Sequence, residues 1–360
     1  MAACIRDRDA RHKFLNKYKI KSKFRKLRDD NRRLFNDFNR LLNEVQIIRS
    51  RLDALRTEYN RHMYEWEWDK NVSFRVAPIE NTYALGPENN VTLAIVSISK
   101  NEGPYLREWI EYHKLVGVDR FYIYDNESDD NTKEVLEPYI KDGTVVYHFL
   151  PNHPITQLVP HIEAFNDAIF KYRNKTKWMA LIDIDEFIVP VEKNTIIEFL
   201  ADYEYYPAVV VNWVGFDSNG HDKKPTAHGG LLTANYTRVR KDYNVPFNRY
   251  VKSIVNPKLV VKYLSAHDGL YYLNTSAVTE NFERTRGMTT KFHSSNKIRI
   301  NHYKTKSREE YLYKITRNLR AFHAASQFQE STLNFEDETI EDLVIQKYVP
   351  QLKQVLGIKE

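Results

Sequence analysis

The stretch Trp178-Met179-Ala180-Leu181-Ile182-Asp183-Ile184-Asp185-Glu186-Phe187 decides the fold and also points to a site. Its first five residues are apolar and predict a fully buried strand. Because side chains two positions apart on a strand share a face, Asp183 and Asp185 are expected to point to the same side. Buried carboxylates are costly unless they bind a cation or hydrogen-bond donors. The pair therefore suits a divalent metal whose open positions remain for phosphate.

Strands and helices alternate upstream of this stretch. The predicted strands are 92–99, 120–124, 144–150 and 178–182, and the predicted helices are 103–117, one that begins after Asn131, and 158–169. This order predicts an α/β fold with parallel strands and helices on both faces of the sheet. The later part is less regular, with predicted strands at 208–213, 231–240, 253–255 and 259–261 and predicted helices at 311–320 and 339–356.

Polar clusters follow three of the first four predicted strands. They contain Asn101 and Glu102, then Asp125 and Asn126, then Asp183 and Asp185. In open α/β sheets, ligands bind beyond the carboxyl ends of the strands. Each cluster alone is explained by turn chemistry, but their coincidence at one edge favours a site for a ribose, a base edge and a metal-bound diphosphate.

A later segment adds an imidazole and two ammonium groups. His302 is followed by Lys304 and Lys306, just before the predicted start of a helix at Ser307. A single histidine is more often a packed or surface residue. Here a metal ligand is a reasonable alternative, because lysines and a helix N-terminus favour a diphosphate.

Several other chemistries lack their motifs. The chain has no P-loop, no G-x-G-x-x-G after the first predicted strand and no G-x-S-x-G nucleophile elbow. It has one cysteine, Cys4, so it forms no intrachain disulfide and shows no Cys/His zinc spacing.

The first 70 residues contain neither Pro nor Gly and predict a long coiled-coil helix. Apolar residues recur every seven positions at Leu27, Leu34, Leu41, Ile48 and Leu55, and a second series follows at Asn31, Phe38, Val45, Leu52 and Tyr59. This 4–3 spacing is typical of a coiled coil and predicts a homodimer. The alternative is an amphipathic helix that lies on its own domain.

The net charge of +6 is unevenly distributed. Residues 1–33 contain 13 Lys or Arg against 4 Asp, a balance of +9, so the rest of the chain carries about −3. The basicity therefore does not indicate nucleic-acid binding by the whole protein. We expect a cytoplasmic protein whose basic arm contacts anionic lipid at the membrane face, or an arm that is simply solvated.

These patterns divide the chain into four parts. Residues 1–70 form the basic coiled-coil helix, 71–90 a linker with Pro78 and Pro87, 91–325 the α/β domain, and 326–360 a C-terminal helical segment.

Seven motifs together resemble glycosyltransferase family 92. They are Lys100-Asn101-Glu102, Glu108-Trp109, Tyr124-Asp125-Asn126-x-Ser128-x-Asp130, Asp183-Ile184-Asp185-Glu186-Phe187, Trp213-Val214-x-Phe216-x-Ser218-x-Gly220-His221, Lys252-Ser253-Ile254-Val255 and Asn301-His302-Tyr303…Lys306-Ser307. They occur in the family's order over about residues 92–318. The family has Phe-Gly-Ser-Ser-Gly-His where this chain has Phe216-Asp217-Ser218-Asn219-Gly220-His221. Its eukaryotic members carry an N-terminal membrane span, whereas a basic coiled coil is predicted here.

The resemblance implies a GT-A (Rossmann-like) fold with a mixed sheet flanked by helices. It also implies an inverting, metal-dependent transferase that moves a hexose, galactose in most relatives, from a nucleotide-sugar, UDP-linked in most, to a glycan or glycolipid. Mn²⁺ or Mg²⁺ would be the cofactor.

On this interpretation the candidate site residues take separate roles. Asn101, Glu102, Asp125, Asn126, Asp183, Lys304 and Lys306 bind the donor; Asp183, Asp185 and His302 bind the metal; Trp213 and Phe216 contact the acceptor; and Asp217, Asp222 or Asp268 is the general base. Packing in the core is an equal alternative for the two aromatic residues. Two other functions stay open: nucleotidyl or phosphosugar transfer at the same metal site, and a coiled-coil adaptor with a decayed transferase domain.

Overall fold

The computed structural model describes residues 91–151, 160–272, 275–322 and 339–359, with isolated helical positions between Lys23 and Ile48. The chain separates into two units, Met1–Ala77 and Pro78–Glu360. Most of the predicted coiled coil and the linker at 71–90 lie outside the described residues. Within these described ranges no helix is long and apolar enough to cross a membrane.

The first half of the larger unit confirms the predicted alternation. Its elements are β1 (Val91–Ser99), α2 (Gly103–Leu115), β2 (Arg120–Asp125), α3 (Thr132–Lys141), β3 (Val145–Phe149), α4 (Pro160–Tyr172) and β4 (Thr176–Leu181). These four strands are parallel and lie in the order β3-β2-β1-β4. The order reverses at β1, so the crevice between the ends of β1 and β4 is the expected position of a ligand.

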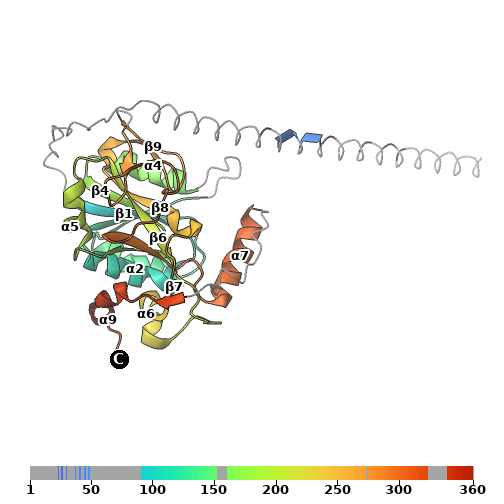
Figure 1. Ribbon diagram of the computed structural model, residues 1–360. Helices are drawn as coiled ribbons and strands as arrows, with labels where there is room; N and C mark the ends of the chain where they lie inside the picture. Colours follow the sequence, from blue (N-terminus) through green and yellow to red (C-terminus); the bar gives the residue numbers. More distant parts are fainter. Residues whose placement is uncertain are drawn as a thin grey trace, which may run out of the picture. The chain divides into compact units, whose positions relative to one another are not determined.

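The apolar side chains of β1 alternate between two cores. Leu93 and Ile95 pack with Trp109 of α2, whereas Ala94 and Val96 pack on the other face with Phe165 of α4. Figure 1 shows helices on both sides of the sheet, as burial on both faces requires. A strand with apolar residues at consecutive positions, Leu93 to Val96, is stable here because each face of the sheet is covered.

The second half extends this sheet with strands of both directions. The elements are β5 (Glu186–Pro190), β6 (Ala208–Gly215), β8 (Val251–Val255), β11 (Ala277–Val278), β12 (Arg284–Thr285) and β13 (Ile298–His302). β8 lies between β4 and β6 and is antiparallel to both, while β13 pairs in parallel with β6 and antiparallel with β5. The predicted α/β class, a mixed sheet flanked by helices, is confirmed.

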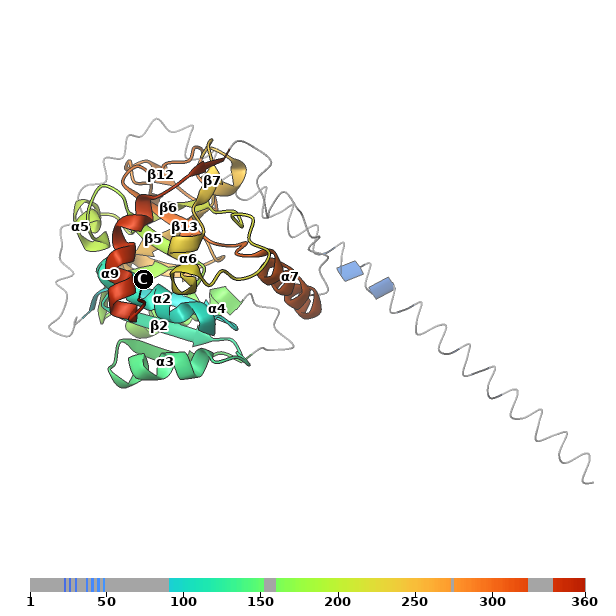
Figure 2. The same ribbon diagram turned by 90° about the horizontal axis from the view of Figure 1, so that it is seen from below.

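Shorter elements complete the unit. They are α5 (Ile196–Leu200), α6 (Leu232–Asn235), β7 (Arg238–Arg240), β9 (Val260–Tyr263), β10 (Gly269–Tyr271), α7 (Arg308–Phe322), β14 (Thr339–Glu341) and α9 (Val349–Leu356). In Figures 1 and 2, α7 projects from the body of the domain.

Two sequence-based predictions were wrong. The strand predicted at 231–240 is the helical turn α6 followed by the short strand β7. The buried carboxylate of Glu108 accepts hydrogen bonds from the backbone N–H groups of Leu232 (2.7 Å) and Thr233 (2.9 Å), which favours a helix start. The single helix predicted at 339–356 is β14, which pairs with β7, then a 3₁₀ turn and α9.

Candidate active site

The ends of several strands meet at one edge of the sheet. β1, β2 and β4 are parallel, and the pairing through β8 gives β6 and β13 the same direction. Their carboxyl ends therefore lie on the side where the antiparallel β8 begins. This topology brings the predicted Asp183, Asp185 and His302 together with Lys252, although 69 residues separate Lys252 from Asp183.

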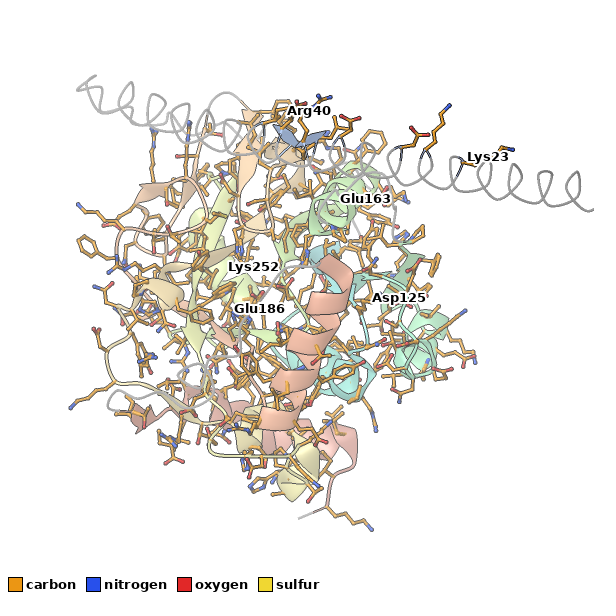
Figure 3. The ribbon with its side chains drawn as sticks, turned by 90° about the vertical axis from the view of Figure 1, so that its right-hand side faces the viewer. Lys23, Arg40, Asp125, Glu163, Glu186 and Lys252 are labelled. Carbon is orange, nitrogen blue, oxygen red and sulfur yellow. The ribbon has the colours of Figure 1, made fainter. Side chains whose placement is uncertain are left out.

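Asp183 lies among charged partners from three elements. Its Oδ2 accepts a hydrogen bond from Lys252 Nζ on β8 at 3.0 Å, and its Oδ1 is 3.1 Å from His161 Nε2 on α4. The Glu186 carboxylate accepts the Asp183 backbone N–H at 2.9 Å and lies 3.9 Å from Lys252 Nζ. Figure 3 labels Lys252 and Glu186 within this part of the domain.

These contacts shift the pKa values of the neighbouring Asp183 and Glu186 carboxyl groups in opposite directions. Burial raises the pKa of Asp183, but Lys252 and His161 outweigh burial and leave that pKa below its usual value. Burial raises the pKa of Glu186 well above normal, since Lys252 compensates only in part. The Lys252 side chain is 1 % exposed, and its acidic neighbours outweigh burial and raise its pKa. Asp183 is therefore ionised and Lys252 is cationic at neutral pH, whereas burial favours the protonated form of Glu186.

Asp185 is also held by a cation. Lys314 of α7 donates a hydrogen bond from Nζ to Asp185 Oδ2 at 2.7 Å, and His302 Nε2 lies 3.5 Å from Asp185 Oδ1. Burial raises the pKa of Asp185, but Lys314, His302 and Lys306 outweigh it and keep that pKa well below normal. Burial lowers the pKa of His302 despite the nearby carboxylate, so its ring is neutral at pH 7.

The donor atoms at this edge match a hard divalent cation in kind. Two carboxylates and a neutral imidazole are suitable ligands for such an ion. His302 Nδ1 and Glu186 Oε1 are buried without a hydrogen-bond partner among the described residues. Within the same residues, however, no three His, Cys, Asp or Glu side chains stand close enough together to hold a metal. Protein atoms would therefore supply only part of a coordination shell.

The predicted nucleotide-side residues shape the loops after β1 and β2. Asn101 has a left-handed φ of 58° and its backbone N–H donates to Ser128 Oγ at 3.0 Å. Asp125 accepts the Ser128 N–H at 2.9 Å and the Tyr147 hydroxyl at 2.8 Å. These bonds fix the two loops against each other beside the switch point. The Asn126 amide donates to the Leu150 carbonyl at 3.0 Å and so joins β3 to the same edge.

Glu102 and the two predicted phosphate-binding lysines lie near the ends of β1 and β13. Lys306 Nζ donates to Glu102 Oε2 at 2.9 Å and lies 3.8 Å from the centroid of the Tyr105 ring. Lys304 Nζ lies 5.4 Å from the centroid of Phe247. Burial and the neighbouring Lys314 lower the pKa of Lys304, while Asp185 opposes them.

The predicted acceptor-side aromatic residues are core residues. Phe216 is 2 % exposed and packs against Tyr303 with ring centroids 4.7 Å apart. Trp213 is 7 % exposed and lies beneath His302, with their ring centroids 4.3 Å apart. This burial contradicts stacking of Phe216 on an acceptor sugar and gives Trp213 the role of supporting His302.

The three general-base candidates occupy different surroundings. Asp217 is 1 % exposed, and its Oδ1 accepts the Asn219 N–H at 2.8 Å, so it stabilises a turn and offers no accessible carboxylate. The exposed Asp222 and the half-buried Asp268 remain accessible. No contact joins any of the three to Asp183 or Asp185 among the described interactions.

The sequence analysis assigned no role in the site to four residues, Lys252, Glu186, His161 and Lys314. Lys252 had a visible signal, because a charged residue lies in a strand of five residues that is otherwise free of charge. Glu186 was part of the quoted acidic stretch but was assigned no role. His161 and Lys314 lie on amphipathic helices and have no local signal in the sequence. Only the tertiary structure brings them to the two aspartates.

The fold and this edge define a Rossmann-like α/β protein with an acidic site at its switch point. The model for glycosyltransferase family 92 matches residues 95–356, which is most of the chain. The protein therefore belongs to glycosyltransferase family 92.

Individual relatives match at lower coverage. A family 92 protein of rice (Oryza sativa subsp. japonica) is 27 % identical over 67 % of this chain and 38 % of its own length. A galactan β-1,4-galactosyltransferase of Arabidopsis thaliana, GALS3, is 33 % identical over 28 % of this chain and 22 % of its own length. The chain thus spans well under half of either relative. Among solved structures, TarS of S. aureus matches with a TM-score of 0.32, 13 % identity and 67 % coverage of both chains.

Proposed function

We propose that this protein is an inverting hexosyltransferase that moves a galactose-like sugar from a UDP-linked donor to a glycan or glycolipid. The observation that carries the proposal is the pair of ionised carboxylates at the switch point of the sheet, the buried Asp185 and the partly exposed Asp183. Family membership and the galactosyltransferase name of one relative support the reaction class and the sugar.

The donor would lie along the edge between β1 and β4. Asn101, Asp125 and Asn126 shape the loops that would surround the nucleoside, and Asp183 would contact the ribose or the metal. Asp185 and His302 would hold Mn²⁺ or Mg²⁺. When bound, this ion would neutralise charge on the departing nucleoside diphosphate. Lys304 would contact the phosphates directly.

Inversion requires a single displacement. The acceptor hydroxyl attacks the anomeric carbon, the bond to the nucleoside diphosphate breaks, and the hydroxyl proton passes to a carboxylate. Asp222 and Asp268 are the proposed bases, since Asp217 is buried. Glu186 is not proposed as the base, because its carboxylate already accepts the Asp183 backbone N–H at 2.9 Å and burial favours its protonated form.

Calorimetric titration of UDP-galactose and other nucleotide-sugars with Mn²⁺ tests the proposal. We expect Asp185→Ala to abolish metal-dependent donor binding while the melting curve stays cooperative, because a hard ligand is lost from a site with few protein ligands. Asp202→Asn, which alters an exposed carboxylate elsewhere, serves as the control and should bind the donor normally.

Three results would contradict parts of the proposal. Unchanged donor affinity in Asp185→Ala would remove the metal assignment. Release of a nucleoside monophosphate in place of the diphosphate would favour nucleotidyl or phosphosugar transfer. Failure of the wild-type chain to bind any nucleotide-sugar would favour an adaptor with a decayed transferase domain.

A further inference from the structure

Two lysines from distant loops converge on one tyrosine ring. Lys306 Nζ lies 3.8 Å from the centroid of Tyr105, and Lys224 Nζ lies 4.1 Å from the same centroid. Tyr105 belongs to the first turn of α2 and is 5 % exposed. The two ammonium groups are therefore separated by no more than the sum of these two distances.

The two lysines differ in their acidic partners. Lys306 donates a hydrogen bond to Glu102 at 2.9 Å. Lys224 forms no ion pair with a carboxylate among the described residues, and the nearest acidic charge that acts on it is Glu108. The Glu108 oxygens already accept three hydrogen bonds from Leu232 and Thr233. The half-buried Lys224 therefore lies near a second cation, Lys306, and little negative charge offsets the repulsion between them.

The charge environment agrees with this geometry. Burial lowers the pKa of Lys224, and repulsion by Lys306 lowers it further, while Glu108 opposes them. An anion placed between like charges removes such repulsion. Hydrogen bonds from an ammonium group to an anionic oxygen span about 2.8 Å, so an anionic group that contacts both lysines would offer a separate oxygen to each.

A second, independent feature lies on the same ring. The Tyr105 hydroxyl is buried and has no hydrogen-bond partner among the described residues. An unsatisfied buried hydroxyl is costly and rare in native proteins, so each case needs an explanation. A ligand oxygen that accepts this hydrogen bond would supply one.

We propose that Lys224, Lys306 and Tyr105 form a subsite for an anionic group, a carboxylate or a phosphate, carried by the acceptor glycan. This inference rests on the proposed transferase function and specifies its acceptor class. The subsite lies beside the candidate catalytic edge, because Lys306 also acts on Asp185.

Position assigns the subsite to the acceptor and not to the donor diphosphate. The charged groups that act on Lys304 are Lys314 and Asp185, at the proposed metal site. Those that act on Lys224 are Lys306 and Glu108, and neither Lys314 nor Asp185 is among them. Lys224 belongs to the connection from β6 to α6, a different segment from the nucleotide-side loops after β1 and β2.

Binding measurements with matched sugars test the subsite. The probes are trigalacturonic acid against neutral galactotriose, and galactose 6-phosphate against galactose, each with the full chain in the presence of UDP and Mn²⁺. We expect at least tenfold tighter binding of one acidic probe than of its neutral partner. The pair that shows the preference identifies a carboxylate or a phosphate.

Variants connect the preference to these side chains. Lys224→Met should remove the preference, Lys224→Arg should retain most of it, and the exposed neighbour control Lys223→Met should leave it within twofold of wild type. Tyr105→Phe should weaken the acidic probe severalfold without lowering the melting temperature, since the hydroxyl has no described protein partner to lose.

Different outcomes test the anionic subsite and the proposed transferase function on which it rests. If UDP and Mn²⁺ fail to bind the wild-type chain, the proposed function fails. If they bind but the protein shows no acidic preference, or the preference survives both Lys224→Met and Tyr105→Phe, only the subsite is overturned. Equal losses of UDP and acidic-probe affinity in Lys224→Met would assign the lysine pair to the donor diphosphate and overturn the acceptor assignment.

Discussion

Asp185 is paired with an ammonium group at the position where the proposed mechanism needs a metal. Lys314 Nζ donates to its Oδ2 at 2.7 Å. A lysine ammonium and a divalent cation on the same carboxylate repel each other. Lys314 therefore opposes metal binding at Asp185, and a movement of its side chain or of α7 would favour the metal.

We predict that Lys314→Met raises the affinity for Mn²⁺ at least tenfold in the absence of nucleotide, because the competing cation is removed. The variant should also melt at a lower temperature without metal, since Asp185 is left buried without its cation, and should regain stability when Mn²⁺ is added. Electron paramagnetic resonance of free Mn²⁺ and thermal melting are the two measurements.

The matched control is Lys304→Met. It removes the same charge from the same neighbourhood but breaks no described hydrogen bond to Asp185. A similar gain in Mn²⁺ affinity in both variants would mean that general charge, and not displacement of Lys314, governs metal entry.

His113 shows how burial at one residue sets the pH dependence of stability. Its Nδ1 donates to the Trp109 carbonyl at 2.8 Å, and its Nε2 accepts the Ile188 N–H at 3.2 Å, so the neutral ring satisfies both bonds. Burial lowers the pKa of this imidazole to about 3. In the unfolded chain the same group takes up a proton near pH 6.5.

The unfolding free energy is therefore expected to fall as pH decreases from about 6.5 towards 3, because the unfolded state binds a proton that the folded state excludes. The loss is about 1.4 kcal/mol per pH unit for this histidine. Urea unfolding of wild type and His113→Gln between pH 7 and 4 measures it. The variant should show a shallower slope by about one proton; an identical slope would contradict the assignment.

The acidic half of the site could be predicted from sequence, but most of its cations could not. Asp183 and Asp185 follow the predicted strand β4, while the strand β13 that ends at His302 was not predicted. Lys314 and His161 come from helices whose faces are chosen by packing, which no local pattern specifies. Phe216 and Asp217 are buried after β6, which no local pattern in the sequence specifies.

At the scale of elements, the first half of the domain follows local rules and the second half does not. Strands β1 to β4 are apolar runs bounded by Pro, Gly and polar turns, so periodicity identifies them. The short elements α6 and β14 exist because of distant partners: Glu108 binds the start of α6, and β14 pairs with β7. A single helix at 339–356 would have contained Pro350 in its interior. In the structure Pro350 lies in the first turn of α9, where a proline is tolerated.

A buried ion pair attaches this C-terminal segment to the sheet. Arg299 of β13 donates to Asp342 Oδ2 at 2.7 Å, and the Tyr243 hydroxyl donates to the same carboxylate. The Asp342 backbone N–H also donates to the Thr237 carbonyl at 2.7 Å. The side chains of Arg299 and Asp342 are both nearly inaccessible to solvent.

We predict that Asp342→Asn lowers the unfolding free energy by about 3 kcal/mol or more, because it leaves the Arg299 guanidinium buried without its counter-charge. Denaturant unfolding measures the loss, and limited proteolysis should show earlier cleavage near 339–345. Glu341→Gln changes the exposed neighbouring carboxylate and should cost less than about 0.5 kcal/mol. Equal effects of the two substitutions would contradict a special role for the pair.

At the scale of the whole molecule, residues 1–70 carry an excess of positive charge and a predicted apolar seam, and they belong to a different unit from the α/β domain. The basic arm at 1–33 carries +9. We propose that it binds anionic lipid at a cytoplasmic membrane face, at about 1 kcal/mol per basic residue close to the surface. Salt-sensitive flotation with phosphatidylserine vesicles should depend on this arm, and a chain that begins at Val91 should not float.

The last prediction is that residues 20–60 make the protein a homodimer. Of the heptad positions, Leu41, Val45 and Ile48 are described; they are helical and 56 %, 61 % and 57 % exposed in the single chain. Burial of such side chains contributes about 1.5–3 kcal/mol each before entropic losses, and a second copy offers the same seam in register. Light scattering should give twice the chain mass for the full chain and one chain mass for a protein that begins at Val91. Leu41→Asp with Ile48→Asp should give monomers that still bind UDP and Mn²⁺, whereas a monomeric wild type at micromolar concentration would rule the dimer out.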